Sequence, residues 1–149
     1  DILPDRAKLA ERNLPSSCTS ICGDASNMES LSDGSFDAVM SVTMFIQLLD
    51  DNLARVIALE MIRVCRPGGK IIIFDWRYDF WRKRYRAVDK RRLGSLFEIG
   101  SKTDLAGTQN GPLIPPIGRF LSKRLPFLYF PVALIPGLAG LKAYTLVKK

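Results

Sequence analysis

The fold class is decided by residues 66–75, which read RPGGKIIIFD. The Pro-Gly-Gly turn ends the segment before it, and the apolar run that follows is the clearest β-strand in the sequence. Upstream, residues 50–64 place apolar side chains at helical spacing behind two aspartates that can cap a helix. Residues 36–42 form a second apolar run, typical of a parallel strand buried on both faces. Strand, helix and strand with short connections predict a βαβ unit in a parallel sheet.

Weaker patterns flank this unit on both sides. They predict a helix over 3–13, a brief buried strand over 19–23, a polar loop over 25–35, a helix near 89–97, a Gly- and Pro-rich loop over 103–118 and a closing strand near 143–148.

The composition suits one globular domain with an uneven charge distribution. The chain has 149 residues, 47% of them apolar, and a net charge of +7. Residues 1–65 carry 5 basic and 10 acidic side chains, whereas residues 66–149 carry 17 basic and 5 acidic ones. A basic half suggests nucleic acid, anionic lipid or a phosphorylated substrate, and the motifs must decide among them.

Several classes of site are excluded by residue types alone. The sequence has no histidine, so it offers no histidine base, catalytic triad or zinc-binding histidine. The three cysteines, Cys18, Cys22 and Cys65, lack paired spacing, which predicts no metal site and no disulfide framework. A reducing, cytoplasmic location fits this cysteine content, and the first residues lack the pattern of a signal peptide.

Three motifs carry the chemistry of the chain. They are Gly23-Asp24-Ala25, then residues 34–39 (GSFDAV), then residues 60–71 (EMIRVCRPGGKI). In this order and spacing they resemble the class I S-adenosylmethionine-dependent methyltransferases of the type 11 group. The resemblance implies a Rossmann-like α/β sheet, mainly parallel with an antiparallel last strand. It also implies S-adenosylmethionine as cofactor and methyl transfer as the activity.

The resemblance places the cofactor at the carboxyl ends of the strands. Asp24 would accept from the adenine amine, Met28 would lie against the ring, and Asp1 would hold the ribose hydroxyls. The cofactor-binding residues that it implies are Asp1, Ile2, Gly23, Asp24, Ala25, Met28, Ser41 and Val42. Ordinary alternatives stay open: a turn or capping aspartate at Asp24, core packing at Met28 and a frayed terminus at Asp1.

The candidate catalytic residues lie at the end of the strand at 70–75 and directly after it. Asp75 or Tyr78 would accept or relay a proton from a substrate hydroxyl, and Arg77 would hold an anionic group. A satisfied strand-end carboxylate and interfacial aromatics are the structural alternatives at these positions.

One element of the family has no match in the sequence. The glycine-rich loop that packs against the methionine part of the cofactor is absent from residues 1–149. We therefore expect a single methyltransferase domain that lacks its N-terminal βαβ portion, a fragment that is inactive alone. Residues 1–80 would form its cofactor-side core, and residues 81–149 an acceptor lid and C-terminal strands.

The expected partner is a small acceptor, anionic or linked to a sugar or glycan. A non-catalytic interaction module and a basic nucleic-acid-binding domain are the alternatives, the latter because residues 81–92 mix basic and aromatic side chains. A solvated loop and helix face explains that mixture better. Residues 125–141 are apolar but contain three prolines, so we expect no transmembrane span there. Peripheral membrane contact stays open because cations flank this segment.

Overall fold

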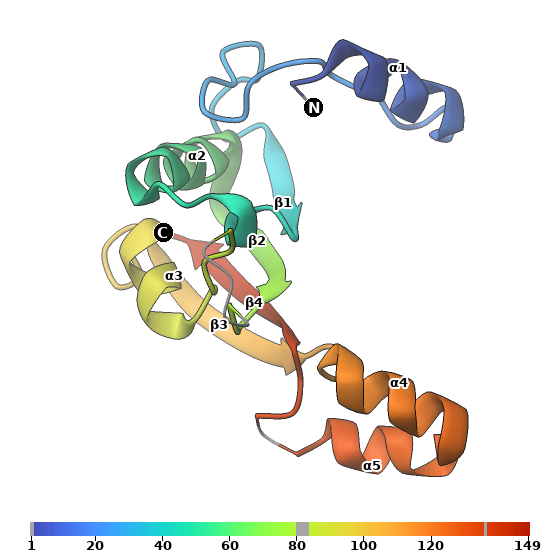
Figure 1. The fold of residues 1–149 in the computed structure, drawn as a ribbon. Coiled ribbons are helices and arrows are strands. Elements are labelled where there is room, and N and C mark those ends of the chain that lie inside the picture. Colours follow the sequence, from blue (N-terminus) through green and yellow to red (C-terminus); the bar gives the residue numbers. More distant parts are fainter. Residues whose placement is uncertain (1, 80–83, 136) are drawn as a thin grey trace.

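A four-stranded β-sheet forms the centre of the molecule (Figure 1). The computed structural model describes residues 2–79, 84–135 and 137–149. Its strands are β1 (Phe36–Val42), β2 (Cys65–Trp76), β3 (Thr103–Asn110) and β4 (Leu141–Lys148), in the spatial order β1-β2-β4-β3. β1 and β2 are parallel, and β4 pairs antiparallel with both β2 and β3. Of the four described strands, three run in one direction and the last runs opposite, which confirms the predicted sheet.

Helices α2 and α3 cover one face of this sheet (Figure 1). The described helices are α1 (Pro4–Asn13), α2 (Asp51–Val64), α3 (Lys90–Leu96), α4 (Pro115–Arg124) and α5 (Tyr129–Ala133), with the 3-10 turns η1 (Phe45–Gln47) and η2 (Pro126–Leu128). α2 begins as predicted, because the Asp50 carboxylate accepts the Asn52 N–H at 2.8 Å. Its apolar stripe packs with α3 and with alternate residues of β2 and β4 to form the core.

The prediction that β1 is buried on both faces is wrong. Val39 and Ser41 point into the core, whereas Phe36, Met40 and Val42 on the other face are 40%, 65% and 50% exposed. β1 lies at the edge of the described sheet, so only the side chains that face α2 are covered.

Two further predictions are corrected. Residues 103–118 form β3 and the start of α4 instead of a loop. The side chains of this segment do not indicate a strand, but pairing with β4 provides hydrogen bonds for its backbone. Residues 19–23 form no strand, because none of the described strands pairs with them. Among the described helices, none has both the length and the apolarity needed to cross a membrane.

Candidate functional site

The carboxyl ends of β1 and β2 lie side by side. They bring the predicted cofactor-binding residues of β1 close to the predicted catalytic residues at the end of β2. Val42 pairs with Phe74 in the parallel ladder, and Thr43 donates its N–H to the Phe74 carbonyl at 2.8 Å. One turn further, the N–H of Ile46 donates to the Asp75 carboxylate at 3.2 Å. The structure thus brings the positions predicted to bind the cofactor, at the end of β1, next to the predicted catalytic positions at the end of β2.

Asp75 is a buried carboxylate with two backbone donors. Its side chain has no solvent exposure, and its oxygens accept the N–H groups of Ile46 and Trp76. Burial raises the pKa of Asp75, against the lowering influence of these N–H groups and of the charge of Arg92. The carboxylate therefore fixes the η1 turn to the end of β2.

Two unusual features lie at the end of β1. Ser41 is 7% exposed, and among the described residues its hydroxyl is the buried side-chain polar atom that has no hydrogen-bond partner. Thr43 has a φ of 50°, a left-handed conformation that a β-branched residue rarely adopts. Strain and an unsatisfied polar atom, two residues apart, are the features expected of a ligand-binding edge.

Tyr78 and Arg77 connect the end of β2 to the chain that enters β4. The Tyr78 hydroxyl donates to the Gly137 carbonyl at 2.7 Å, and the Arg77 N–H donates to the Gly140 carbonyl at 3.0 Å. The Arg77 guanidinium lies 5.1 Å from the centre of the Tyr78 ring. These contacts explain how the residue pair is positioned, and both side chains remain partly exposed.

Gly23, Asp24, Ala25 and Met28, which the resemblance predicts to bind the cofactor, lie in one loop, here called the cofactor-side loop. The Asp24 carboxylate is exposed and accepts the Ser26 N–H at 2.8 Å. Ser26 lowers the pKa of Asp24, so the carboxylate is ionised at neutral pH and keeps free acceptor positions. Gly23 is also exposed, whereas Ala25 and Met28 are half-buried and pack against the core.

Asp1 and Ile2, the first two residues of the chain, were predicted to bind the cofactor, and the structure describes Ile2. Asp1, the predicted ribose acid, lies outside the described residues, as do 81–83 of the basic run. Ile2 is 64% exposed, and its carbonyl is within 3.9 Å of the Cys22 thiol.

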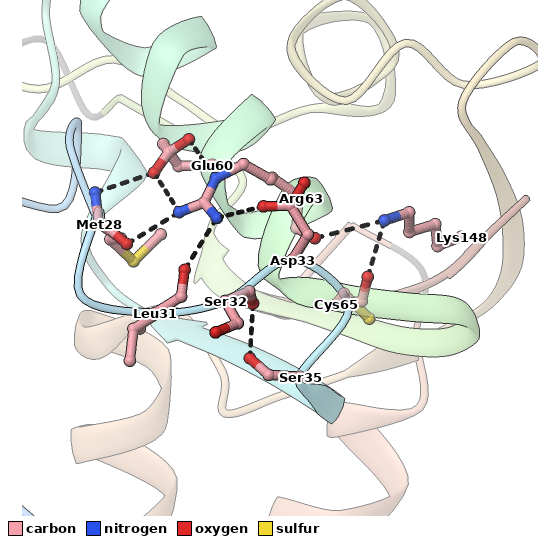
Figure 2. A network of polar contacts seen from close by, with 9 residues as sticks. All are labelled: Met28, Leu31, Ser32, Asp33, Ser35, Glu60, Arg63, Cys65 and Lys148. Carbon is pink, nitrogen blue, oxygen red and sulfur yellow. Dashed lines mark hydrogen bonds and ion pairs between the residues drawn. The ribbon is translucent and has the colours of Figure 1, made fainter.

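A clasp formed by Glu60 and Arg63 holds the cofactor-side loop on α2 (Figure 2). The Glu60 carboxylate accepts the Met28 N–H at 2.8 Å, and Arg63 donates to the carbonyls of Met28 and Leu31, each at 2.8 Å. The two side chains also bind each other at 2.8 and 2.9 Å, and Arg63 pairs with Asp33. One guanidinium therefore fixes both ends of the segment 28–33.

Lys148, at the end of β4, binds the end of the helix that carries the clasp. Its ammonium donates to the carbonyls of Arg63 and Cys65 at the end of α2, at 3.4 and 2.8 Å (Figure 2). A cation suits this position because the last carbonyls of a helix have no partner within the helix, and the Arg63 carbonyl also accepts the Gly34 N–H at 2.9 Å.

Glu60 and Arg63 belong to the third sequence motif, but the sequence did not indicate a role for them. An acid and an arginine at i and i+3 on a helix are a signal for an ion pair, but the loop carbonyls that Arg63 binds have no side-chain signature. Arg92 also binds backbone carbonyls that no sequence pattern indicates, although it was expected on a solvated helix face. It is 9% exposed and donates to the carbonyls of Phe45 and Leu48 and to Asp51.

Replacing Glu60 with glutamine should lower the free energy of unfolding by about 1–2 kcal/mol at pH 7, because the clasp loses a charge-assisted pair. The hydrogen bond from Arg63 lowers the pKa of Glu60, with burial opposing it and the Met28 N–H adding to it. A lowered carboxyl pKa stabilises the protein above the unfolded-state pKa, and this stability disappears as the pH falls through the folded-state value. Urea unfolding from pH 7 to pH 3 should show the two proteins converge in acid.

The exposed Glu11 on α1 provides the matched control for this measurement. Glu11→Gln should follow the wild-type curve at every pH. A constant difference between wild type and Glu60→Gln down to pH 3 would contradict the ionic nature of the clasp.

The chain is similar to known methyltransferases in part of its sequence and in its fold. Residues 1–73 match the family model of the methyltransferase domain. No curated protein matches the chain by sequence. A SAM-dependent methyltransferase from Methanosarcina mazei has a similar structure, with a TM-score of 0.66 and 15% identity over 100% of this chain and 79% of that one. One from Archaeoglobus fulgidus has a TM-score of 0.67 and 14% identity, over 100% and 74% of the two chains.

A third similar structure is a complex of the Trm112 methyltransferase activator of Haloferax volcanii with a methyltransferase. Its TM-score is 0.69 with 16% identity, over 99% of this chain and 69% of that one. These likenesses show the fold, which is that of the class I methyltransferases. The family match over residues 1–73 covers just under half of the chain, and together with this fold it implies S-adenosylmethionine as the cofactor.

Proposed function

We propose that the domain transfers the methyl group of S-adenosylmethionine to a small acceptor that carries an anionic or sugar-linked group. The observation that supports this most directly is the junction of the β1 and β2 ends, where the hydroxyl of Ser41 is buried without a partner. Arg77 and Tyr78 follow the end of β2, and both side chains are partly exposed.

The described residues fit the cofactor. Asp24 offers an ionised acceptor for an amine, and Met28 offers a half-buried thioether for an aromatic ring. Ser41 offers a hydroxyl at the end of β1 to which no described residue is hydrogen-bonded. When bound, S-adenosylmethionine supplies an electrophilic methyl group on a sulfonium, and the protein's contribution is to align the acceptor with it.

On the acceptor side, we assign different roles to the three predicted residues. Arg77 would hold an anionic group of the acceptor, and the Tyr78 hydroxyl would accept or relay a proton. Asp75 is buried, so we assign it the role of holding the η1 turn in position. The net positive charge of residues 66–149 favours an anionic acceptor.

Replacing Asp24 with asparagine should weaken binding of S-adenosylhomocysteine about tenfold, because a charge-assisted hydrogen bond to the adenine amine becomes a neutral one. Saturation-transfer NMR on the 149-residue chain detects weak ligands and reports on the adenine protons directly. The matched control is Asp104→Asn, an exposed aspartate on β3, which should bind as the wild type does.

The same measurement tests the acceptor. With S-adenosylhomocysteine present, glucose 6-phosphate should receive saturation that glucose does not, and Arg77→Ala should abolish it. Equal adenine signals in wild type and Asp24→Asn would overturn the cofactor assignment. Equal signals from the two sugars would overturn the anionic acceptor and leave the cofactor result untouched.

A further inference from the structure

The segment 115–135, here called the lid hairpin, exposes an unusual amount of apolar surface. It contains α4, η2 and α5, which pack chiefly on one another. Its exposed apolar side chains are Phe120, Phe127, Phe130, Leu134 and Ile135, at 60%, 71%, 78%, 79% and 49% exposure. On the surface of a soluble protein, exposed apolar side chains are normally scattered singly. Five such side chains within sixteen residues therefore require an explanation.

The lid hairpin stands apart from the rest of the molecule. α4 and α5 lie beyond the ends of β3 and β4, away from α1 and α2 (Figure 1). Its base is closed by backbone hydrogen bonds from Ile114 to Leu138 and from Gly140 to Pro112, at 3.0 and 2.9 Å. The exposed apolar side chains are therefore carried on a fastened projection that can reach a flat surface.

The charge around this apolar surface has one sign. The lid hairpin itself, residues 115–135, contains three cations and no aspartate or glutamate. On α4, Phe120 is exposed between Arg119 on one side and Lys123 and Arg124 on the next turn, and all three cations are exposed too.

We propose that the lid hairpin binds the surface of an anionic phospholipid bilayer, with α4 and α5 in the plane of the interface. Phenylalanine and aliphatic side chains enter the boundary of the acyl region, while arginine and lysine stay at the level of the phosphates. A nucleic acid would satisfy the cations and stack on the aromatic rings, but it would leave Leu134 and Ile135 in water. The combination of aliphatic exposure with unopposed positive charge favours the bilayer.

Vesicle co-sedimentation of the 149-residue chain tests the proposal. Vesicles of phosphatidylcholine with phosphatidylglycerol should bind the protein, and vesicles of phosphatidylcholine alone should bind it much more weakly. Phe127→Ser with Phe130→Ser should weaken binding at least tenfold, on the order expected when two buried aromatic side chains are lost. Lys123→Gln with Arg124→Gln should weaken it about fivefold for each cation removed.

Matched controls come from exposed residues far from the lid hairpin. Leu9→Ser with Leu53→Ser, and Lys8→Gln with Arg12→Gln, should bind vesicles as the wild type does. Circular dichroism checks that each variant is folded. Equal binding by lid and control variants, or no binding by the wild type, would overturn the proposal. The proposal would also be overturned if these residues were needed for self-association or for oligonucleotide binding and not for vesicle binding.

Discussion

Replacing Gly69 with alanine should lower the free energy of unfolding by about 3 kcal/mol or more, the range in which backbone has to move to admit a side chain. A Cβ at this position would lie 2.6 Å from the Cys65 sulfur, 2.8 Å from the Arg66 carbonyl oxygen and 2.9 Å from the Asp37 carbonyl oxygen. Two of these three neighbours are backbone atoms, one in β2 itself and one in β1, so no change of side-chain rotamer relieves the contact. Urea unfolding followed by circular dichroism measures the loss.

Gly107 on β3 provides the matched control. An alanine Cβ at this position would have no atom within 4 Å, and its backbone conformation is an ordinary one. Gly107→Ala should change the free energy of unfolding by no more than about 0.5 kcal/mol. If both variants unfold at the same urea concentration, close packing at Gly69 is not what requires glycine in the motif.

The two glycines of the Pro-Gly-Gly turn serve different needs. Gly68 has a φ of 72°, a conformation that favours glycine, and a Cβ there would meet only the tip of the Arg66 side chain at 3.9 Å. Gly69 instead provides the close approach between the start of β2 and β1. The sequence predicted a turn at this point, but it could not separate a conformational requirement from a steric one.

The central part of the fold could be predicted because its signals are local. β1, α2 and β2 each carry a periodic apolar pattern, and Asp50 caps α2 as its residue type predicts. α3 and β4 were found for the same reason, since Asp89 accepts the Arg92 N–H at 2.7 Å and β4 is apolar and β-branched.

The outer elements depend on pairing that the sequence does not display. β3 reads TDLAGTQN, in which few residues favour a strand, and its ladder with β4 supplies the backbone hydrogen bonds. Residues 19–23 show the reverse case. Their small and β-branched side chains suit a strand, but none of the described strands lies alongside them.

The candidate site divides in the same way. Asp24, Ser41 and Asp75 were predicted because chemically capable residues lie at the ends of predicted strands, and their role at the site stays a prediction. The left-handed Thr43 and the buried Arg92 carry no pattern that sets them apart, since each depends on backbone brought in from distant segments. Arg92, for example, binds carbonyls more than forty residues away in sequence.

Replacing Asp75 with alanine should lower the free energy of unfolding by about 2–4 kcal/mol, because the N–H groups of Ile46 and Trp76 lose their acceptor in a buried place. Asp75→Asn should stay within about 1 kcal/mol of the wild type, since an amide oxygen still accepts and no charge is buried. Thermal or urea unfolding of the two variants separates the hydrogen bonds from the charge. Equal losses in both variants would mean that the carboxylate charge itself is needed.

The pH dependence distinguishes the two contributions further. Because burial raises the pKa of Asp75, the folded protein retains a proton that the unfolded chain releases. Wild-type stability should therefore fall as the pH rises from the unfolded-state pKa through the folded-state value, and Asp75→Asn should lack this component. The difference between the two proteins should grow toward neutral pH in favour of asparagine. If the difference in stability between the two proteins shrinks toward neutral pH instead, Arg92 stabilises the ionised carboxylate by more than burial destabilises it. Asp75 would then hold the η1 turn through its charge, as an ion-pair partner.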